Sequence, residues 1–264
     1  IRVCGVKMIT ENEKLEDKVP NKLLAIELTQ CLKLKTLTFS HPVEFIYNPL
    51  EYAYDMHSNF IHKFCQTTKR ILFLGMNPGP WGMSQTGVPF GQIAAVKDWL
   101  QVSGEVGRPE IEHPSRQVTG LNCTRSEVSG QRFWGFFREL CGSPEVFFKH
   151  AFVHNLCPLA FMSSSGKNVT PLELKAAERR SLYSICDESL REVVQLLQVE
   201  IIIGIGKFAE TRANSAIKGL EHNIKVTSIP HPSPRNLGCK NWPQDVRKRL
   251  EELDLLSVLS PEHS

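Results

Sequence analysis

Four short apolar runs constrain the fold of this chain more than any other feature. They are KRILFLG at 69–75, FVHNL at 152–156, VEIIIGIG at 199–206 and IKVTSIP at 224–230. Each run is bounded by Gly, Pro or Asn, and continuous apolar runs of this length are typical of strands buried on both faces of a parallel sheet. The sequence therefore predicts a four-stranded parallel sheet that is covered on both faces.

Amphipathic segments alternate with these runs, because parallel strands need a crossover between them, usually a helix. In the first segment, Leu24, Leu28 and Leu32 form an apolar stripe that we expect to face the core. We predict a three-layer α/β/α fold in one domain over residues 21–264, preceded by a loosely ordered mixed-charge segment at 1–20. The expected helices lie at 21–34, 48–65, 92–100, 130–140, 171–197, 207–217 and 243–256.

Composition and charge exclude several classes of protein. The 264 residues are 41% hydrophobic and 22% charged, which is typical of a soluble globular chain, and no apolar run is long enough to span a membrane. A net charge of +3 is too balanced to indicate a nucleic-acid partner, so any such contact must rest on local charge. The eight cysteines form no C-x-x-C pair, and we expect reduced thiols and no metal site.

Polar residues follow the ends of the four runs. In an open parallel sheet, ligands bind beyond the carboxyl ends of the strands. GMNPGPWGMSQTGVPFG at 75–91 follows the first run, Asn155 ends the second, a Gly-rich turn at 204–206 follows the third, and HPSPRN begins at His231 after the fourth. Two asparagines, one histidine and two loops stiffened by Pro and Gly are thus predicted to meet at one edge of the sheet.

The segment 75–91 and the late HPSPRN, in this order and spacing, resemble the two signature motifs of the uracil-DNA glycosylase superfamily. Within it, the resemblance is to the single-strand-selective monofunctional family, and it covers about Asn21 to the C-terminus. It implies a DNA glycosylase of base excision repair that flips out and hydrolytically removes uracil and C5-oxidised uracils, such as 5-hydroxymethyluracil, from single- and double-stranded DNA. We expect an abasic product, no cofactor, no metal, no membrane partner, a monomer and a location in the nucleus.

The residues suit this reaction chemically. It requires a water at the sugar C1′, stabilisation of a departing pyrimidine anion and a pocket for a flipped base. The resemblance assigns the placing of the water to Asn77, which can orient a water but cannot take its proton. It assigns His231 to the pyrimidine O2, where negative charge develops. Taken alone, an Asn before Pro is ordinary turn chemistry, and a loop His commonly caps a carbonyl.

Recognition of the base is assigned to further residues of these loops. Asn155 can donate to O4 and accept from N3 of uracil, and cytosine offers the reverse pattern, which predicts selectivity for uracil. The motif position makes Phe90 the candidate to stack on the base; an ordinary core aromatic is the alternative. By resemblance, the backbone amides of Met76, Gly79 and Met83 line the O2 and C5 side of the pocket. That side tolerates polar C5 substituents but not the methyl group of thymine.

Two loops are predicted to contact the DNA. The resemblance places Arg235 as a wedge in the gap left by the flipped nucleotide, and Lys240 and Asn241 at phosphates. The small residues after 162 and a helix start at Thr170 and Pro171 suit phosphate binding, with a solvated loop and helix cap as the alternative. The predicted DNA-binding residues are Ser163, Ser164, Ser165, Gly166, Lys167, Asn168, Pro232, Ser233, Pro234, Arg235, Asn236, Lys240 and Asn241.

Two other functions fit parts of the sequence. Residues Gly204, Gly206 and Ala209 match the dinucleotide fingerprint G-x-G-x-x-A, but the following run lacks the carboxylate that the fingerprint requires. A catalytically inactive sensor of damaged DNA on the same fold is the second alternative. Asn77 and His231 argue against it, because a protein that only binds DNA needs neither a water-positioning amide nor an anion stabiliser.

Overall fold

A four-stranded parallel sheet forms the centre of the structure, a computed structural model that describes residues 18–234 and 241–261. Three of its strands are buried along their whole length, including one of the two edge strands. The fourth strand, at the other edge, is partly exposed. The predicted parallel sheet is therefore confirmed. In spatial order the strands are β3 (Ala151–Asn155), β2 (Ile71–Gly75), β6 (Ile201–Ile205) and β7 (Lys225–Ile229).

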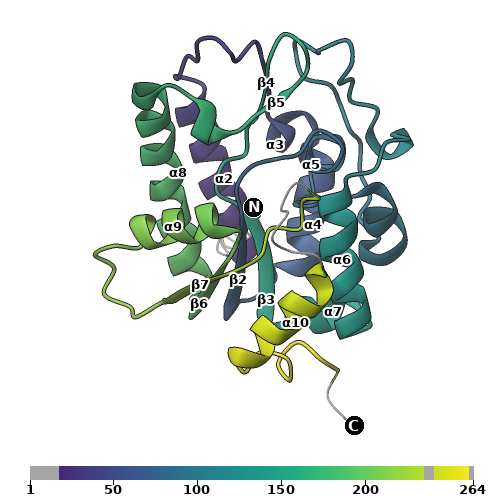
Figure 1. Ribbon diagram of the computed structural model, residues 1–264, viewed down its shortest axis with the longest axis vertical. Helices are drawn as coiled ribbons and strands as arrows, with labels where there is room; N and C mark the ends of the chain where they lie inside the picture. The colour runs from purple at the N-terminus through teal and green to yellow at the C-terminus, as the bar shows by residue number, and fades with distance from the viewer. Residues whose placement is uncertain (1–17, 235–240, 262–264) are drawn as a thin grey trace, which may run out of the picture.

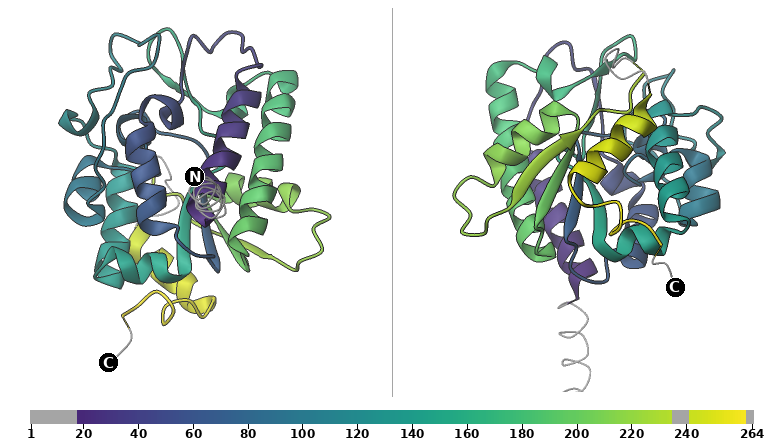
Figure 2. Two further views of the ribbon diagram at one scale, coloured as in Figure 1. Left: turned by 180° about the vertical axis from the view of Figure 1, so that it is seen from behind. Right: turned by 60° about the horizontal axis from the view of Figure 1, so that its bottom comes forward.

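Helices cover both faces of this sheet (Figures 1 and 2). The layer on one face contains α2 (Val19–Leu34), α8 (Ala176–Leu197) and α9 (Lys207–Ala216). The layer on the other contains α4 (Tyr54–Phe64), α6 (Val128–Cys141), α7 (Pro144–His150) and α10 (Trp242–Glu252). The three-layer α/β/α fold is confirmed. No described helix is both long enough and apolar enough to cross a membrane.

The buried face of α2 differs from the prediction. Leu28 and Leu32 are 60% and 57% exposed, whereas Glu27 is only 3% exposed. The expected leucine stripe was therefore wrong, because the helix is rotated so that Glu27 meets partners in the core. Leu23, Glu27, Gln30, Cys31 and Leu34 form the buried face of this helix.

Three predicted helices differ in their boundaries. The expected helix at 48–65 is broken at Ala53 into α3 (Pro49–Tyr52) and α4. A Cβ on Gly87 would lie 2.8 Å from the Ala53 carbonyl oxygen, so the glycine-rich loop packs against this break. The helix expected from 171 is a short 3₁₀ turn (Pro171–Glu173) before α8 begins, and the segment at 92–100 ends as a π-helix at Ala95–Leu100.

A second, three-stranded antiparallel sheet was not predicted. It consists of β1 (Phe45–Tyr47), β4 (Ala160–Met162) and β5 (Asn168–Val169), in the order β1–β4–β5. Because β4 begins soon after β3 ends, this small sheet lies at the carboxyl ends of the parallel strands, at the top of Figure 1. It positions the turn at 163–167 beside the loops that follow β2 and β7.

Gly204 in β6 and Gly206 just after it serve helix packing. A Cβ on Gly204 would lie 2.4 Å from the backbone nitrogen of Glu210, so only glycine allows α9 to pack this closely on the strand. Gly206 has φ = 95° at the start of α9, a left-handed backbone that also favours glycine. This packing accounts for the dinucleotide-like pattern without a nucleotide.

Candidate active site

The loop from Gly75 to Gly91 follows β2 and runs beside the end of β3. The Met76 carbonyl oxygen accepts a hydrogen bond from the Cys157 N–H at 3.0 Å, which continues the strand pairing beyond the sheet. Asn77 donates from Nδ2 to the Leu159 carbonyl at 3.1 Å. The half-buried Asn77 amide is thus fixed by the chain that connects β3 to β4, with its oxygen left for another partner.

Phe90 and His231 lie together although they come from opposite ends of the domain. Phe90 adopts φ = 54° and stacks on Phe133 with 4.8 Å between ring centroids. The His231 ring lies 6.5 Å from the Phe90 ring, and its Nδ1 accepts from the Ser233 N–H at 3.0 Å. Burial lowers the pKa of His231, so the ring is neutral at pH 7 and carries its proton on Nε2.

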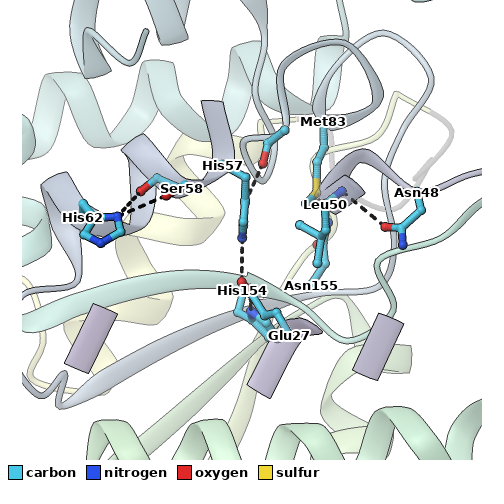
Figure 3. Close-up of polar contacts among 10 residues, drawn as sticks. Glu27, Asn48, Leu50, His57, Ser58, His62, Met83, His154 and Asn155 are labelled. Carbon is cyan, nitrogen blue, oxygen red and sulfur yellow. Dashed lines mark hydrogen bonds and ion pairs between the residues drawn. The ribbon is translucent and has the colours of Figure 1, made fainter. Parts of the chain in front are cut away.

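Asn155 is buried directly below Phe90. A Cβ on Gly75 would lie 2.1 Å from Asn155 Oδ1 and 3.0 Å from the Phe90 ring, so the missing side chain keeps the amide and the ring close. Asn155 Nδ2 lies 3.1 Å from the Met83 sulfur, and Figure 3 shows the two side chains directed at each other. Sulfur is a weak acceptor, so this donor can change partners at little cost.

One pocket of about 680 Å³ joins these loops. Met83, Asn155, Ser163, Ser164, Gly166, Pro232 and Asn241 do not line it, and Arg235, Asn236 and Lys240 lie outside the described residues. Sequence reasoning missed Trp81, Arg116 and Glu127, which also line the pocket. The predicted residues that line it are Met76, Asn77, Gly79, Phe90, Ser165, Lys167, Asn168, His231, Ser233 and Pro234.

The turn at 163–168 is held from the side by the segment 113–116. His113 Nδ1 accepts from the Ser115 N–H, so its Nε2 is the donor to the Ser164 carbonyl at 2.9 Å. Arg116 donates from Nε to the Gly166 carbonyl at 2.8 Å. The turn is therefore fixed in the absence of DNA.

The long helix does not begin at Thr170 and Pro171 as expected, whereas phosphate binding by the loop before it stays a prediction. The Thr170 N–H donates to the Glu173 carboxylate at 2.8 Å, and Lys167 Nζ lies 3.4 Å from the same side chain. A carboxylate thus occupies the donors that a phosphate would use. The long helix begins only at Ala176.

A buried ionised cluster lies below the loop (Figure 3). His57 donates from Nδ1 to the Gly87 carbonyl at 2.8 Å and from Nε2 to Glu27 at 2.7 Å. Because both partners are acceptors, both ring nitrogens carry protons and the ring is an imidazolium. The other Glu27 oxygen lies 3.5 Å from His154 Nδ1, one residue before Asn155.

Burial and pairing act against each other in this cluster. Burial raises the pKa of Glu27, but the charge of His57 and its hydrogen bond outweigh this effect and leave the pKa below its usual value. Burial lowers the pKa of His57, but Glu27 and the bond to Gly87 outweigh it and raise the pKa. Burial alone dominates for His154, whose pKa is lowered. The cluster therefore contains one ion pair and one neutral ring.

Glu127 contacts the same loop from its other side. The backbone N–H groups of Trp81 and Gly82 act on its carboxyl group and favour the ionised form, while its Oε2 is buried without a hydrogen-bond partner in the described structure. A Cβ on Gly79 would lie 2.2 Å from that oxygen, so the glycine makes room for the carboxyl group. Burial raises the pKa of Glu127 to about 7 against the effect of the two N–H donors.

Metal ligands do not cluster in the described part of the chain. Within residues 18–234 and 241–261, no group of three or more His, Cys, Asp or Glu side chains is arranged to hold a metal ion. The six cysteines of these ranges are free thiols. The pocket instead offers amides, a neutral imidazole, aromatic rings and guanidinium groups.

Comparison with known proteins identifies the family. The model of the uracil DNA glycosylase superfamily matches residues 62–254. A single-strand selective monofunctional uracil DNA glycosylase of Mus musculus is 54% identical over 90% of this chain and 86% of its own length. Proteins of the same name from Rattus norvegicus and Bos taurus are 53% identical over 90% of this chain and 52% identical over 86%, covering 86% and 84% of their own lengths.

A solved structure shares the fold. It is titled the crystal structure of WT Pedobacter heparinus SMUG2, and it matches with a TM-score of 0.64 at 18% identity over 90% of this chain and 99% of that chain. From the family model and the curated relatives together, the chain belongs to the uracil DNA glycosylase superfamily and, within it, to the single-strand selective monofunctional uracil DNA glycosylases.

Proposed function

We propose that the pocket holds a uracil nucleotide flipped out of DNA, and that water hydrolyses its N-glycosidic bond there to leave an abasic site. The protein is a uracil-DNA glycosylase, a hydrolase of DNA repair. The observation that supports this assignment of the pocket is the meeting of Asn77, Phe90 and His231 at its wall. They supply an amide for water, a ring for the base and a donor for a leaving anion.

Asn77 places the attacking water. Its Nδ2 is engaged by the Leu159 carbonyl, so the amide is oriented and Oδ1 is the group that accepts a hydrogen bond from water. An amide cannot remove a proton at neutral pH. The reaction therefore proceeds by early departure of the base, and the water captures a sugar with oxocarbenium character.

His231 stabilises the departing base. The neutral ring donates from Nε2 to the pyrimidine O2, where negative charge accumulates as the bond breaks. A preoriented neutral donor strengthens its hydrogen bond as charge develops and does not need to reorganise. Lowering of the His231 pKa by burial keeps the ring neutral, so Nδ1 retains the bond from the Ser233 N–H and Nε2 stays fixed as the donor.

Asn155 selects uracil. Its Nδ2 exchanges the Met83 sulfur for O4 of the base, and Oδ1 accepts from N3–H while the ring stacks on Phe90. Cytosine presents a donor at C4 and an acceptor at N3. The Asn155 Nδ2 donor would then face another donor, and the Oδ1 acceptor would face another acceptor. We propose that the backbone amides of Met76, Gly79 and Met83 face the O2 and C5 side of the bound base, where hydroxymethyl and other oxidised C5 substituents are accepted.

The proposal extends to the DNA itself. We propose that the preformed turn at 163–168 contacts phosphates, and that the residues from Pro232 to Asn236 with Lys240 and Asn241 contact phosphates as well. Arg235 fills the gap in duplex substrates, so both single- and double-stranded DNA are processed. The protein acts as a monomer in the nucleus, which analytical ultracentrifugation and imaging of a tagged chain would test.

Excision by matched variants tests this function. A uracil-containing oligonucleotide is incubated with the protein in EDTA and then treated with alkali, which cleaves at abasic sites. We expect excision by the wild type, and losses of about a hundredfold to a thousandfold in single-turnover rate for Asn77→Ala and His231→Leu. DNA affinity should change little, because phosphate contacts supply most of the binding.

A leaving-group series separates the two residues. Uracils with electron-withdrawing C5 groups leave more easily, so their excision rate should fall least in His231→Leu. In Asn77→Ala, the fall in excision rate should not depend on the C5 group in this way. Equal dependence on leaving-group pKa in wild type and His231→Leu would remove the anion-stabilising role. Binding of uracil DNA without any excision would instead favour an inactive damage-binding protein.

A further inference from the structure

An aromatic ring and two guanidinium groups meet at the rim of the pocket. Trp81 is half-buried and lines the pocket with Asn77 and His231. The guanidinium carbon of Arg116 lies 5.0 Å from the Trp81 ring centroid, and that of Arg125 lies 5.5 Å away. We refer to Trp81, Arg116 and Arg125 as the rim cluster.

The rim cluster is built before any ligand is present. The backbone N–H of Trp81 faces the carboxyl group of the half-buried Glu127, and Arg116 is held by its bond to the Gly166 carbonyl. Each guanidinium restrains the ring through a cation–π contact. Little conformational entropy is therefore left to lose when a ligand binds at this rim.

The charges of the rim cluster are not neutralised by the protein. Among the described residues, no carboxylate forms an ion pair with Arg116 or Arg125. Lys167 faces the same pocket but lies next to Glu173. Since the whole chain has a net charge of only +3, two guanidinium groups without an ion-pair partner beside one half-buried ring form a local concentration of positive charge at the pocket mouth.

Aromatic rings beside unpaired cations are the two elements of sites that bind single-stranded nucleic acid. The ring stacks on a base, and the cations contact the phosphates that flank it. We propose that the rim cluster binds the single-stranded DNA next to the flipped nucleotide, with the Trp81 indole against the neighbouring base and the two guanidinium groups on its phosphates. This inference rests on the proposed function of the adjoining pocket.

The rim cluster also bears on strand preference. A neighbouring base in single-stranded DNA is unpaired and can leave its own stack to contact Trp81. In a duplex the same base is paired and stacked, so it gains much less from the indole. Trp81 should therefore contribute more to single-stranded than to double-stranded substrates, whereas a wedging Arg235 would contribute more to duplexes.

Substitutions at Trp81 test the stacking contact. The probe is a thymidine oligonucleotide with one central uracil, single-stranded or paired with a complementary strand, in single-turnover assays that separate the half-saturating enzyme concentration from the maximal rate. Trp81→Ala should raise the half-saturating concentration on single strands by about fivefold to a hundredfold. Trp81→Phe should retain most of the affinity, and the loss on duplex should be smaller.

Substitution of Arg125 tests the phosphate contact. Fluorescence anisotropy of a labelled thymidine oligonucleotide gives the slope of log Kd against log salt concentration. Arg125→Ala should reduce the magnitude of that slope by about 0.7, the value for one phosphate on a single strand, and Arg125→Lys should restore it. Lys218→Ala is the control, because Lys218 is exposed in the segment leading into β7, at the opposite edge of the sheet.

Two results would overturn the inference. One is a Trp81→Ala variant that binds single strands as tightly as the wild type, or whose whole loss falls on the maximal rate. The other is an unchanged salt slope in Arg125→Ala. Because anisotropy needs no excision, a wild type that binds but does not excise uracil would refute the proposed function while leaving the rim cluster testable.

Discussion

Two glutamates, the buried Glu27 and the half-buried Glu127, support the same glycine-rich loop in opposite ways. Glu27 acts from below, through His57 to the Gly87 carbonyl, and Glu127 acts from the rim, on the N–H groups of Trp81 and Gly82. The first has a cationic partner and a lowered pKa. The second has only backbone donors, an oxygen without a partner and a pKa raised to about 7.

The difference shows that burial does not decide the charge of a carboxyl group by itself. The His57 imidazolium offsets the cost of desolvation for Glu27. The two backbone N–H groups beside Glu127 do not offset that cost for its carboxylate. The loop is therefore held at Gly87 by a pair whose pKa values are both shifted toward the charged forms. The rim is held by a group that gains and loses a proton near neutral pH.

The largest expected effect comes from breaking the ion pair. Glu27→Gln leaves the His57 imidazolium buried without a carboxylate, which typically costs about 3–5 kcal/mol of unfolding free energy. The raised pKa of His57 gives stability that is full below 6.5 and is lost as pH rises through its folded value. The lowered pKa of Glu27 gives stability that is present above 4.5 and is lost as pH falls.

The loss of unfolding free energy in Glu27→Gln, relative to the wild type, should therefore be greatest between about pH 4.5 and 6.5. Urea unfolding at several pH values measures it. A Glu27→Gln/His57→Gln double variant is the matched control, because it removes the charge together with its partner. It should recover part of the loss. A deficit under about 1 kcal/mol at pH 6 would mean that the pair is not ionised.

Glu127→Gln should have a smaller effect, and it should gain unfolding free energy relative to the wild type as pH rises, whereas Glu27→Gln should be less stable than the wild type. The folded pKa of about 7 lies above the ordinary 4.5, so the wild type loses stability as pH rises between these values, by about 3 kcal/mol in total. Glutamine accepts the same N–H groups without ionising. Its unfolding free energy relative to wild type should therefore increase between pH 5 and pH 8.

Glu139→Gln is the control for this pH series, because the side chain of Glu139 is 74% exposed on α6. Its unfolding free energy should follow that of the wild type across the range. Parallel curves for Glu127→Gln and the wild type would show that the rim carboxyl ionises normally.

The smallest effect is expected at His154, which touches Glu27 only at 3.5 Å. His154→Gln should cost about 1 kcal/mol at pH 7.5, because the ion pair is retained. Since burial lowers the pKa of His154, unfolding below pH 6.5 takes up a proton there, and the variant should lose less stability than wild type at pH 5. A loss as large as that of Glu27→Gln would make His154 an equal member of the ion pair.

The sequence predicted those features that have a local pattern. Continuous apolar runs identified all four parallel strands, and residues just after strand ends identified Asn77 and His231 as neighbours. The small sheet was missed because strands of two or three residues have no periodicity. The fingerprint-like glycines were explained only once the packing of α9 was visible.

The supporting residues of the site could not be predicted in this way. Glu27 meets His57 thirty positions away, and this contact overrides the leucine pattern of its helix. Glu127 and Arg116 reach Trp81 across tens of residues, and neither stands in a recognisable motif. Their roles depend on which segments the fold brings together, and no local pattern of residues indicates those pairings.

The pairing of β2 with β3 sets the relative positions of Asn155 and Asn77. Gly75 is in register with Asn155, so the amide that we propose reads the base and the amide of Asn77 that we propose places the water, two residues after Gly75, are positioned from the same pair of residues in the sheet. Shifting either strand by one residue would turn one of them to the opposite face of the sheet. On this proposal, base selection and water placement depend on the same strand register. An insertion in β2 or β3 that displaces one of the two amides would therefore also displace it relative to the other.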